Sequence, residues 1–138
     1  MSFKITKFKN IIMRETKFEI RIRHKQSGNL WTERFTIDEL INKNHSLYNP
    51  ETQEVLYKRE YTGLKDKNGV EIYEGDIVKH KFRRIWKTEQ HISKVVWDQG
   101  YCCYYLFDEI SNHRMRDDII YEVIGNIYEN PELSNTKI

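Results

Sequence analysis

Closely spaced turn signals in the second half of the chain are the sequence feature that most constrains its fold. The Asn68-Gly69 pair and the segments 74–76 and 98–100, each with a glycine, mark points where an extended chain reverses. The segments between them are short and rich in β-branched and aromatic residues, which is typical of strands. Several such strands within about seventy residues predict a small barrel or a strongly bent sheet, because closure removes exposed sheet edges. The expected strands occupy residues 55–61, 70–73, 77–82, 92–97, 101–107 and 121–128.

The N-terminal part predicts a hairpin followed by a short helix. Phe18, Ile20 and Ile22 alternate with charged residues, as in a strand with one buried face. A turn at 27–29 returns the chain as a second strand over residues 30–35. The next residues, Thr36-Ile37-Asp38-Glu39, match a capping box, and Leu40 and Ile41 would form the apolar side of the helix.

Together these patterns predict a mainly β chain: a small SH3-like β-barrel core with an N-terminal hairpin and one short helix. Residues 1–56 would form the N-terminal arm, the hairpin and the helix, packed on the core. Residues 57–133 would form the barrel, and residues 134–138 a frayed tail.

Composition restricts the partners and the location. The 138 residues carry 23 basic and 21 acidic side chains, a net charge of +2, so no dominant field favours nucleic acid. No apolar run approaches the roughly 20 residues of a membrane span, and no apolar leader is visible. We therefore expect a cytoplasmic protein with no membrane partner.

The two cysteines, Cys102 and Cys103, are neighbours in an aromatic segment. Adjacent strand residues point to opposite faces, so we predict two free, buried and inert thiols. The segment 101–107 is apolar on both faces, which favours contact with the N-terminal segment or with a second copy of the chain.

Two long motifs resemble a known family. The segment YTGLKDKNGVEIYEGDIV (residues 61–78) and the segment EVIGNIYENPEL (residues 122–133) resemble the signature of the YopX family, and MRETKF (residues 13–18) is similar to its usual beginning. The resemblance implies a protein encoded by phages and prophages of bacteria, with an SH3-type barrel core. It implies no activity, cofactor or catalytic residue. The chain departs from the family pattern before Met13, which leaves the role of the arm open.

Three classes of function remain open, and the favoured one is a non-enzymatic interaction module that binds a protein. The first alternative is a nucleic-acid-binding barrel, because a basic and aromatic hairpin can neutralise phosphates and stack on bases. Its candidate residues are Lys79, Lys81, Arg83, Arg84, Trp86 and Lys87.

The second alternative is a small enzyme that uses Glu74 and Asp76, since paired carboxylates can divide acid and base work. These two acids flank a glycine in a turn, where a solvated or amide-capping role is more common. His80 and His91 would face each other across a hairpin, but no zinc-type spacing accompanies them. We expect no cofactor and no metal site.

Overall fold

A computed structural model describes residues 15–42, 48–82, 90–109 and 112–135, and in these ranges the chain is mainly β, as predicted. All strand pairs are antiparallel, in two sheets with the orders β2-β1-β3-β4 and β8-β7-β6-β5-β9. The elements are β1 (Lys17–His24), β2 (Leu30–Thr36), α2 (Ile37–Asn42), β3 (Gln53–Lys65), β4 (Glu71–Tyr73), β5 (Asp76–Phe82), β6 (His91–Asp98), β7 (Cys103–Phe107), β8 (Asn112–Arg114), β9 (Ile119–Asn126) and the 3-10 helix η1 (Pro131–Asn135).

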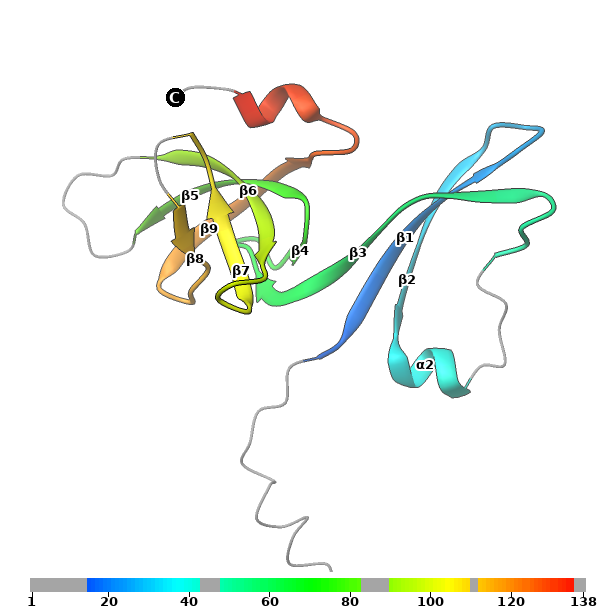
Figure 1. The fold of residues 1–138 in the computed structure, drawn as a ribbon, viewed down its shortest axis with the longest axis horizontal. Helices are drawn as coiled ribbons and strands as arrows, with labels where there is room; N and C mark the ends of the chain where they lie inside the picture. Colours follow the sequence, from blue (N-terminus) through cyan, green and yellow to red (C-terminus); the bar gives the residue numbers. More distant parts are fainter. Residues whose placement is uncertain (1–14, 43–47, 83–89, 110–111, 136–138) are drawn as a thin grey trace, which may run out of the picture.

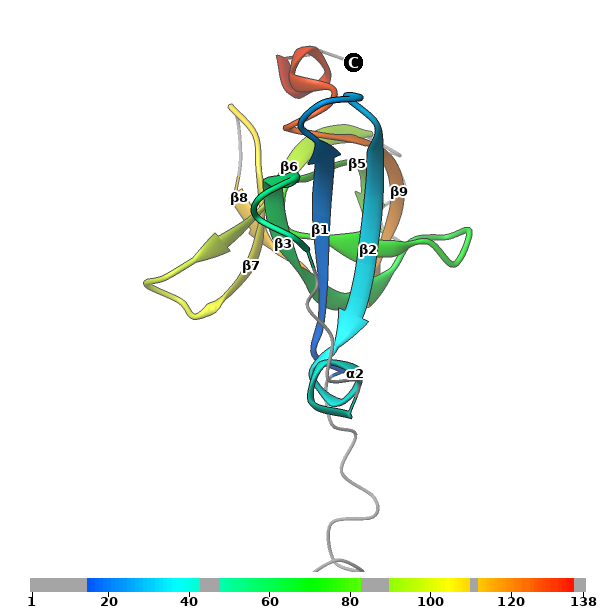
Figure 2. The same ribbon diagram turned by 90° about the vertical axis from the view of Figure 1, so that its right-hand side faces the viewer.

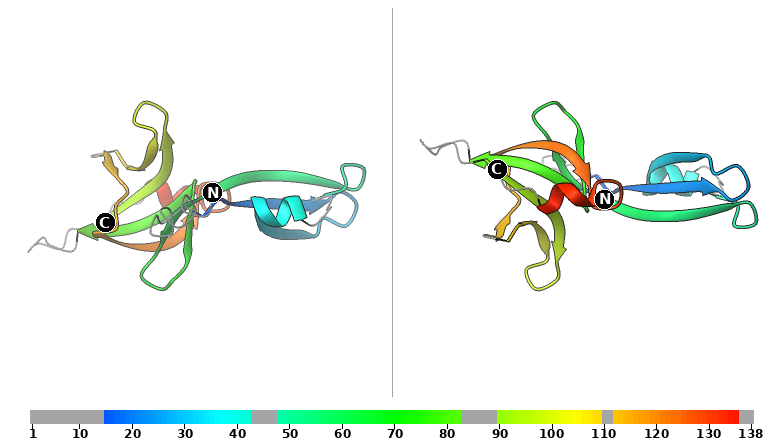
Figure 3. Two further views of the ribbon diagram at one scale, coloured as in Figure 1. Left: turned by 90° about the horizontal axis from the view of Figure 1, so that it is seen from below. Right: turned by 90° about the horizontal axis from the view of Figure 1, so that it is seen from above.

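Three strands project from the molecule as a narrow sheet (Figures 1 and 3). This sheet, which we call the wing, consists of β1, β2 and residues 53–60 of β3. Figure 2 shows β1 and β2 side by side in it. The rest of β3 continues into the compact part of the molecule and pairs there with β4. The division expected between residues 56 and 57 falls inside β3 and stays a prediction.

The compact part contains the hydrophobic core. Lone backbone hydrogen bonds link its two ladders, from Gly75 N to Val95 O at 2.8 Å and from Lys67 N to Tyr121 O at 2.9 Å. The described strands nevertheless do not form one closed barrel, so SH3-like closure stays a prediction. The largest described cluster of buried apolar side chains in the compact part consists of Ile72, Val78, Val95, Tyr104, Leu106, Ile119 and Tyr121.

The Asn68-Gly69 hairpin forms between β3 and β4, with a different turn from the one expected for this dipeptide. A two-residue Asn-Gly turn needs positive φ at both residues, but only Gly69 has it, at 82°. Asp66, which is 8% exposed, holds the longer turn: its Oδ1 accepts hydrogen bonds from the N–H groups of Asn68 (2.8 Å) and Val70 (2.9 Å). Its Oδ2 accepts one from Val123 N–H at 3.1 Å. The hydrogen bonds to the buried Asp66 carboxylate therefore stabilise a turn in which Asn68 does not need a positive φ.

The capping box of α2 is confirmed, but the helix does not pack as expected. Glu39 N–H donates to Thr36 Oγ1 at 3.1 Å, and Thr36 N–H donates to Glu39 Oε2 at 3.2 Å. No residue of α2 is buried, and the helix lies at the end of β2, away from the compact part (Figure 1). Its apolar side therefore faces solvent rather than the core.

Two further segments differ from expectation. Residues 112–118, expected as a loop, begin with the short edge strand β8, whose polar residues carry no alternating pattern. The strand expected from residue 101 begins only at Cys103, because the turn extends through Cys102, which has a φ of 52°. Among the described residues, no helix has the length and apolar character needed to cross a bilayer.

Candidate functional site

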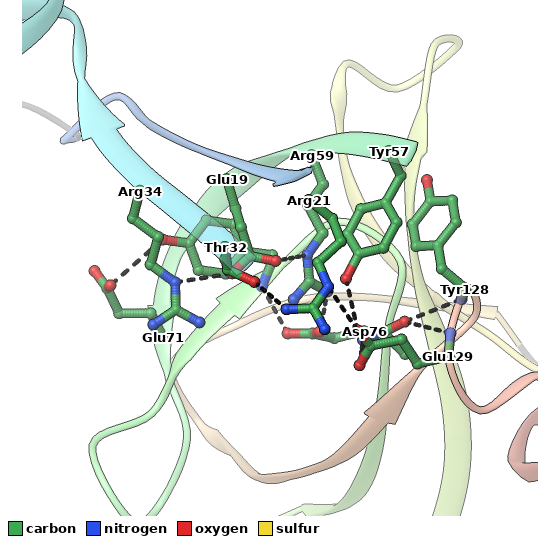
Figure 4. A network of polar contacts seen from close by, with 12 residues as sticks. Glu19, Arg21, Thr32, Arg34, Tyr57, Arg59, Glu71, Asp76, Tyr128 and Glu129 are labelled. Carbon is green, nitrogen blue, oxygen red and sulfur yellow. Dashed lines mark hydrogen bonds and ion pairs between the residues drawn. The ribbon is translucent and has the colours of Figure 1, made fainter. Parts of the chain in front are cut away.

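A buried cluster of charged side chains lies where the wing meets the compact part (Figure 4). Glu19 of β1 and Asp76 of β5 are each 2% exposed, and Arg59 of β3 lies between them. Arg59 Nε donates to Glu19 Oε1 at 2.7 Å, and its Nη1 donates to Asp76 Oδ1. Desolvation opposes the charge of Arg59, but the two carboxylates raise its pKa above the ordinary value. The cluster is an ion triad that couples three strands.

An outer layer extends this triad. Arg34 of β2 donates to Glu19 Oε2 at 2.8 Å, and both Arg34 and Arg59 lie over the Tyr73 ring, at 5.4 and 5.2 Å from its centroid. Burial raises the pKa of the Tyr73 hydroxyl, and the nearby carboxylate of Glu71 raises it further. These contacts make the polar face of the wing part of the structure around Glu19, whereas Arg23 and Glu54 on the same face remain exposed.

The turn after β9 completes the junction. The Tyr128 ring stacks on the Tyr57 ring with centroids 4.2 Å apart, and Glu129 accepts a hydrogen bond from the Tyr57 hydroxyl at 3.2 Å. Glu129 also forms an ion pair with Arg21 at 3.5 Å. Burial, followed by the charge of Glu129, raises the pKa of Tyr57 to about 12.

The geometry gives Glu74 and Asp76 different surroundings. Asp76 is committed to structure, since its second oxygen accepts the Tyr73 N–H at 2.8 Å while the first is bound by Arg59. Burial raises the pKa of Asp76, and Arg59 opposes that shift. Glu74 is half-buried. Neither residue lines the two grooves described below.

Two of the predicted basic residues share a groove. Lys79 and Lys81 alternate with buried residues of β5, as predicted, and line a groove of about 290 Å³ together with Lys67. Glu122 lies in the same groove and pairs with Lys67 at 2.8 Å; this hydrogen bond lowers the pKa of Glu122. The other four candidates, Arg83, Arg84, Trp86 and Lys87, lie outside the described residues.

His80 and His91 face each other across β5 and β6, as predicted, with ring centroids 5.4 Å apart. His80 is 1% exposed, and its Nε2 hydrogen bonds Ser93 Oγ at 2.8 Å. Ser93 in turn donates to Asp108 Oδ2 at 3.1 Å. Within the described ranges no group of three or more His, Cys, Asp or Glu side chains is placed to hold a metal ion.

An exposed set of aromatic and basic side chains covers the outer side of β6 and β7. Phe107 is 43% exposed and Tyr101 is 63% exposed; the ring of Tyr101 lies 5.6 Å from that of Tyr105. Arg114 lies 5.1 Å from the Tyr101 centroid, and Lys94 lies 5.5 Å from that of Phe107. We call this set the aromatic face: Lys94, Tyr101, Tyr105, Phe107 and Arg114.

A second groove, of about 330 Å³, is lined by none of the residues of the aromatic face. Trp97, 39% exposed, lines it and meets the ring of Tyr104 edge-on at 5.0 Å. Both cysteines are free thiols, as predicted, but they also line this groove. The expectation that both are buried is wrong, because Cys102 is exposed on the turn and Cys103 is half-buried.

Sequence reasoning missed the ion triad and the aromatic face. Alternation placed Glu19 on a solvated strand face, and no local pattern links it to Arg59, 40 residues away. The segment 101–107 was recognised as apolar on both faces, but its pairing with Arg114 and Lys94 depends on strand order. The concentration of aromatic residues in segment 101–107, with Tyr105 and Phe107 at alternate positions, was the only available signal.

Of the comparisons with known proteins, the family model identifies the family. A crystal structure described as protein EF1440 from Enterococcus faecalis is 27% identical in sequence, and the match covers 84% of this chain and 75% of that one, with a TM-score of 0.38. None of the curated proteins matches significantly. The family model described as YopX protein matches residues 4–134, nearly the whole chain. On that match, the chain belongs to the YopX protein family.

Proposed function

We propose that the chain is a non-enzymatic interaction module that binds another protein. The observation that carries this proposal is the aromatic face, with Tyr101 and Phe107 exposed at 63% and 43%. Tyrosine, phenylalanine and arginine are enriched in the centres of protein interfaces, and tyrosine and arginine among their energetic hot spots. A soluble chain gains nothing in its own stability from leaving such side chains in water.

The chemistry of the face indicates the kind of protein. Its five side chains include two cations and no acid, and both cations lie close to aromatic rings. A partner segment with carboxylates beside apolar side chains would complement it.

The fold of the compact part, the location of the protein and its origin belong to the same proposal. The compact part would be an SH3-like barrel, supported by the backbone hydrogen bonds that link its two ladders. The protein would act in the cytoplasm of a bacterial host cell as a phage or prophage accessory protein, as its motifs suggest. The proposal requires no cofactor, and the commitment of Asp76 to Arg59 argues against acid–base work at Glu74 and Asp76.

The test is affinity capture of the full chain from bacteria that carry its gene in natural context. We expect a protein to be captured in stoichiometric amount by the wild type and by a Leu56→Ser, Val70→Ser control, in which two other exposed apolar side chains are changed. Tyr101→Ser with Phe107→Ser should weaken the purified complex about thirtyfold in calorimetry. Capture of nothing, or equal capture by both double variants, would contradict the proposal.

A nucleic-acid-binding function is the second candidate, because Lys67, Lys79 and Lys81 line one groove. Three lysines along a groove can track a phosphate backbone. Glu122 pairs with Lys67 and reduces the local positive charge, which is why we rank this candidate second.

The salt dependence of binding distinguishes this candidate. If it is correct, the chain shifts long single-stranded DNA or RNA in a gel at low salt. Lys79→Gln with Lys81→Gln should then reduce the slope of log K against log salt by about one to two. The control pair Lys25→Gln and Lys58→Gln lies on the wing and should leave the slope unchanged. Absence of any shift at low salt excludes the candidate.

A further inference from the structure

β2 is an edge strand, and no strand in the described part of the chain pairs with its outer side. The hairpin bond from His24 N to Asn29 O, 2.8 Å long, sets the alternation of the ladder. Counting from it, Trp31, Glu33 and Phe35 exchange hydrogen bonds with β1, while Leu30, Thr32, Arg34 and Thr36 direct N–H and C=O groups outward.

This edge lacks most of the usual protection. The strand is seven residues long, contains no proline, and pairs with β1 without a bulge. Short strands, prolines, bulges and charged side chains are devices that keep natural edges from pairing, and of these β2 has only the charged side chains of Glu33 and Arg34. Glu33 and Arg34 have opposite charges, so the strand carries no net charge against a strand of its own kind.

Apolar side chains are exposed at both ends of β2. Leu30 at its start is 51% exposed. Ile37, Leu40 and Ile41 follow its end and are 43%, 39% and 72% exposed. Their spacing places the three on one face of α2, and a helix of six residues has little stability of its own in water. This face therefore lacks the packing that a stable short helix requires.

We propose that a second copy of the chain pairs with β2 along this edge, so that two wings form one continuous antiparallel sheet about a two-fold axis. Such an axis places the start of one β2 beside the end of the other. Leu30 of each copy then lies next to Ile37 and Leu40 of the other, and the exposed patches cover each other at both ends of the interface.

The aromatic residues fix the register. An axis at Glu33 places Trp31 of each copy opposite Phe35 of the other copy. The two side chains lie on the same face of the strand, so the axis creates two Trp31–Phe35 pairs. The outward backbone groups of Thr32 and Arg34 meet in the same register. The cost is one unfavourable pair, because the two Glu33 carboxylates face each other at the axis.

Sedimentation velocity over a wide concentration range tests this arrangement on the full chain. We expect a monomer–dimer equilibrium in the wild type. Thr32→Pro removes an outward N–H without breaking the ladder to β1, and should abolish the dimer. Leu40→Ser with Ile41→Ser should weaken the dimer about tenfold or more. Circular dichroism verifies that each variant is folded.

Glu33→Gln provides the test of register, since it removes the repulsion at the axis. It should tighten the dimer about threefold. The aromatic-face variant Tyr101→Ser, Phe107→Ser and the control Leu56→Ser, Val70→Ser should dimerise like the wild type. A chain that is monomeric at every concentration would overturn the proposal, as would a dimer that survives Thr32→Pro. Weakening by Glu33→Gln would overturn the register.

Discussion

Arg59→Met is expected to destabilise the protein by about 3–5 kcal/mol, the largest effect of any single substitution considered for this chain. The substitution leaves Glu19 and Asp76, each 2% exposed, without the cation that lies between them. Two buried carboxylates then have to be protonated or hydrated, and either process opens the junction between wing and compact part. Urea unfolding, with midpoint and slope compared, measures the loss.

The matched control is Arg23→Met, which removes an arginine of β1 on the same face of the wing as Arg59. Arg23 pairs with Glu54, but both side chains are more than a third exposed, so the change should stay within about 1 kcal/mol. Adding Glu19→Gln and Asp76→Asn to Arg59→Met should restore part of the lost stability. Equal stability of the two arginine variants would show that the triad does not hold the junction.

Stability is expected to fall by about 3 kcal/mol between pH 6.5 and pH 4 because of His80 alone. Burial, with a smaller contribution from His91, lowers the pKa of His80 from 6.5 to about 4. The unfolded chain therefore takes up the proton first as the pH falls, so the stabilisation is complete above pH 6.5 and is lost towards pH 4. Asp108 opposes the shift and His113 adds to it.

The geometry around His80 supports this sign. Its Nε2 is bonded to Ser93, whereas its Nδ1 has no hydrogen-bond partner among the described residues, so a proton placed there would be buried without an acceptor. Between pH 6.5 and pH 4, the free energy of unfolding of His80→Leu should fall by about 3 kcal/mol less than that of the wild type. His24→Gln, at the tip of the wing, should keep the slope of the wild type. Parallel curves for wild type and His80→Leu would refute the assignment.

Local signals in the sequence were sufficient for the elements of the fold. Strand alternation located β1, β5 and β6 because one of their faces meets the core, and the capping box located α2 because its hydrogen bonds join residues three apart. β8 was not predicted, because a polar edge strand of three residues shows no alternation of apolar and polar side chains.

The candidate site was only partly accessible to the same reasoning. The pairing of His80 with His91 followed from a hairpin, which is local. The ion triad joins β1, β3 and β5, and a charged residue on a strand is normally read as solvent-facing. Asp66 likewise looked like an ordinary turn residue, but it also binds Val123, 57 residues away. Contacts of this range depend on how the sheets are assembled.

The continuity of β3 has a consequence for how the gene can be divided. One strand supplies the last member of the wing and a member of the compact part, with Arg59 near its middle. A chain cut at residue 56 would leave each fragment without part of its pairing partner, so we expect neither fragment to fold when expressed alone. Exchange of modules between relatives would then succeed only at loop positions outside this strand, with wing and compact part inherited together.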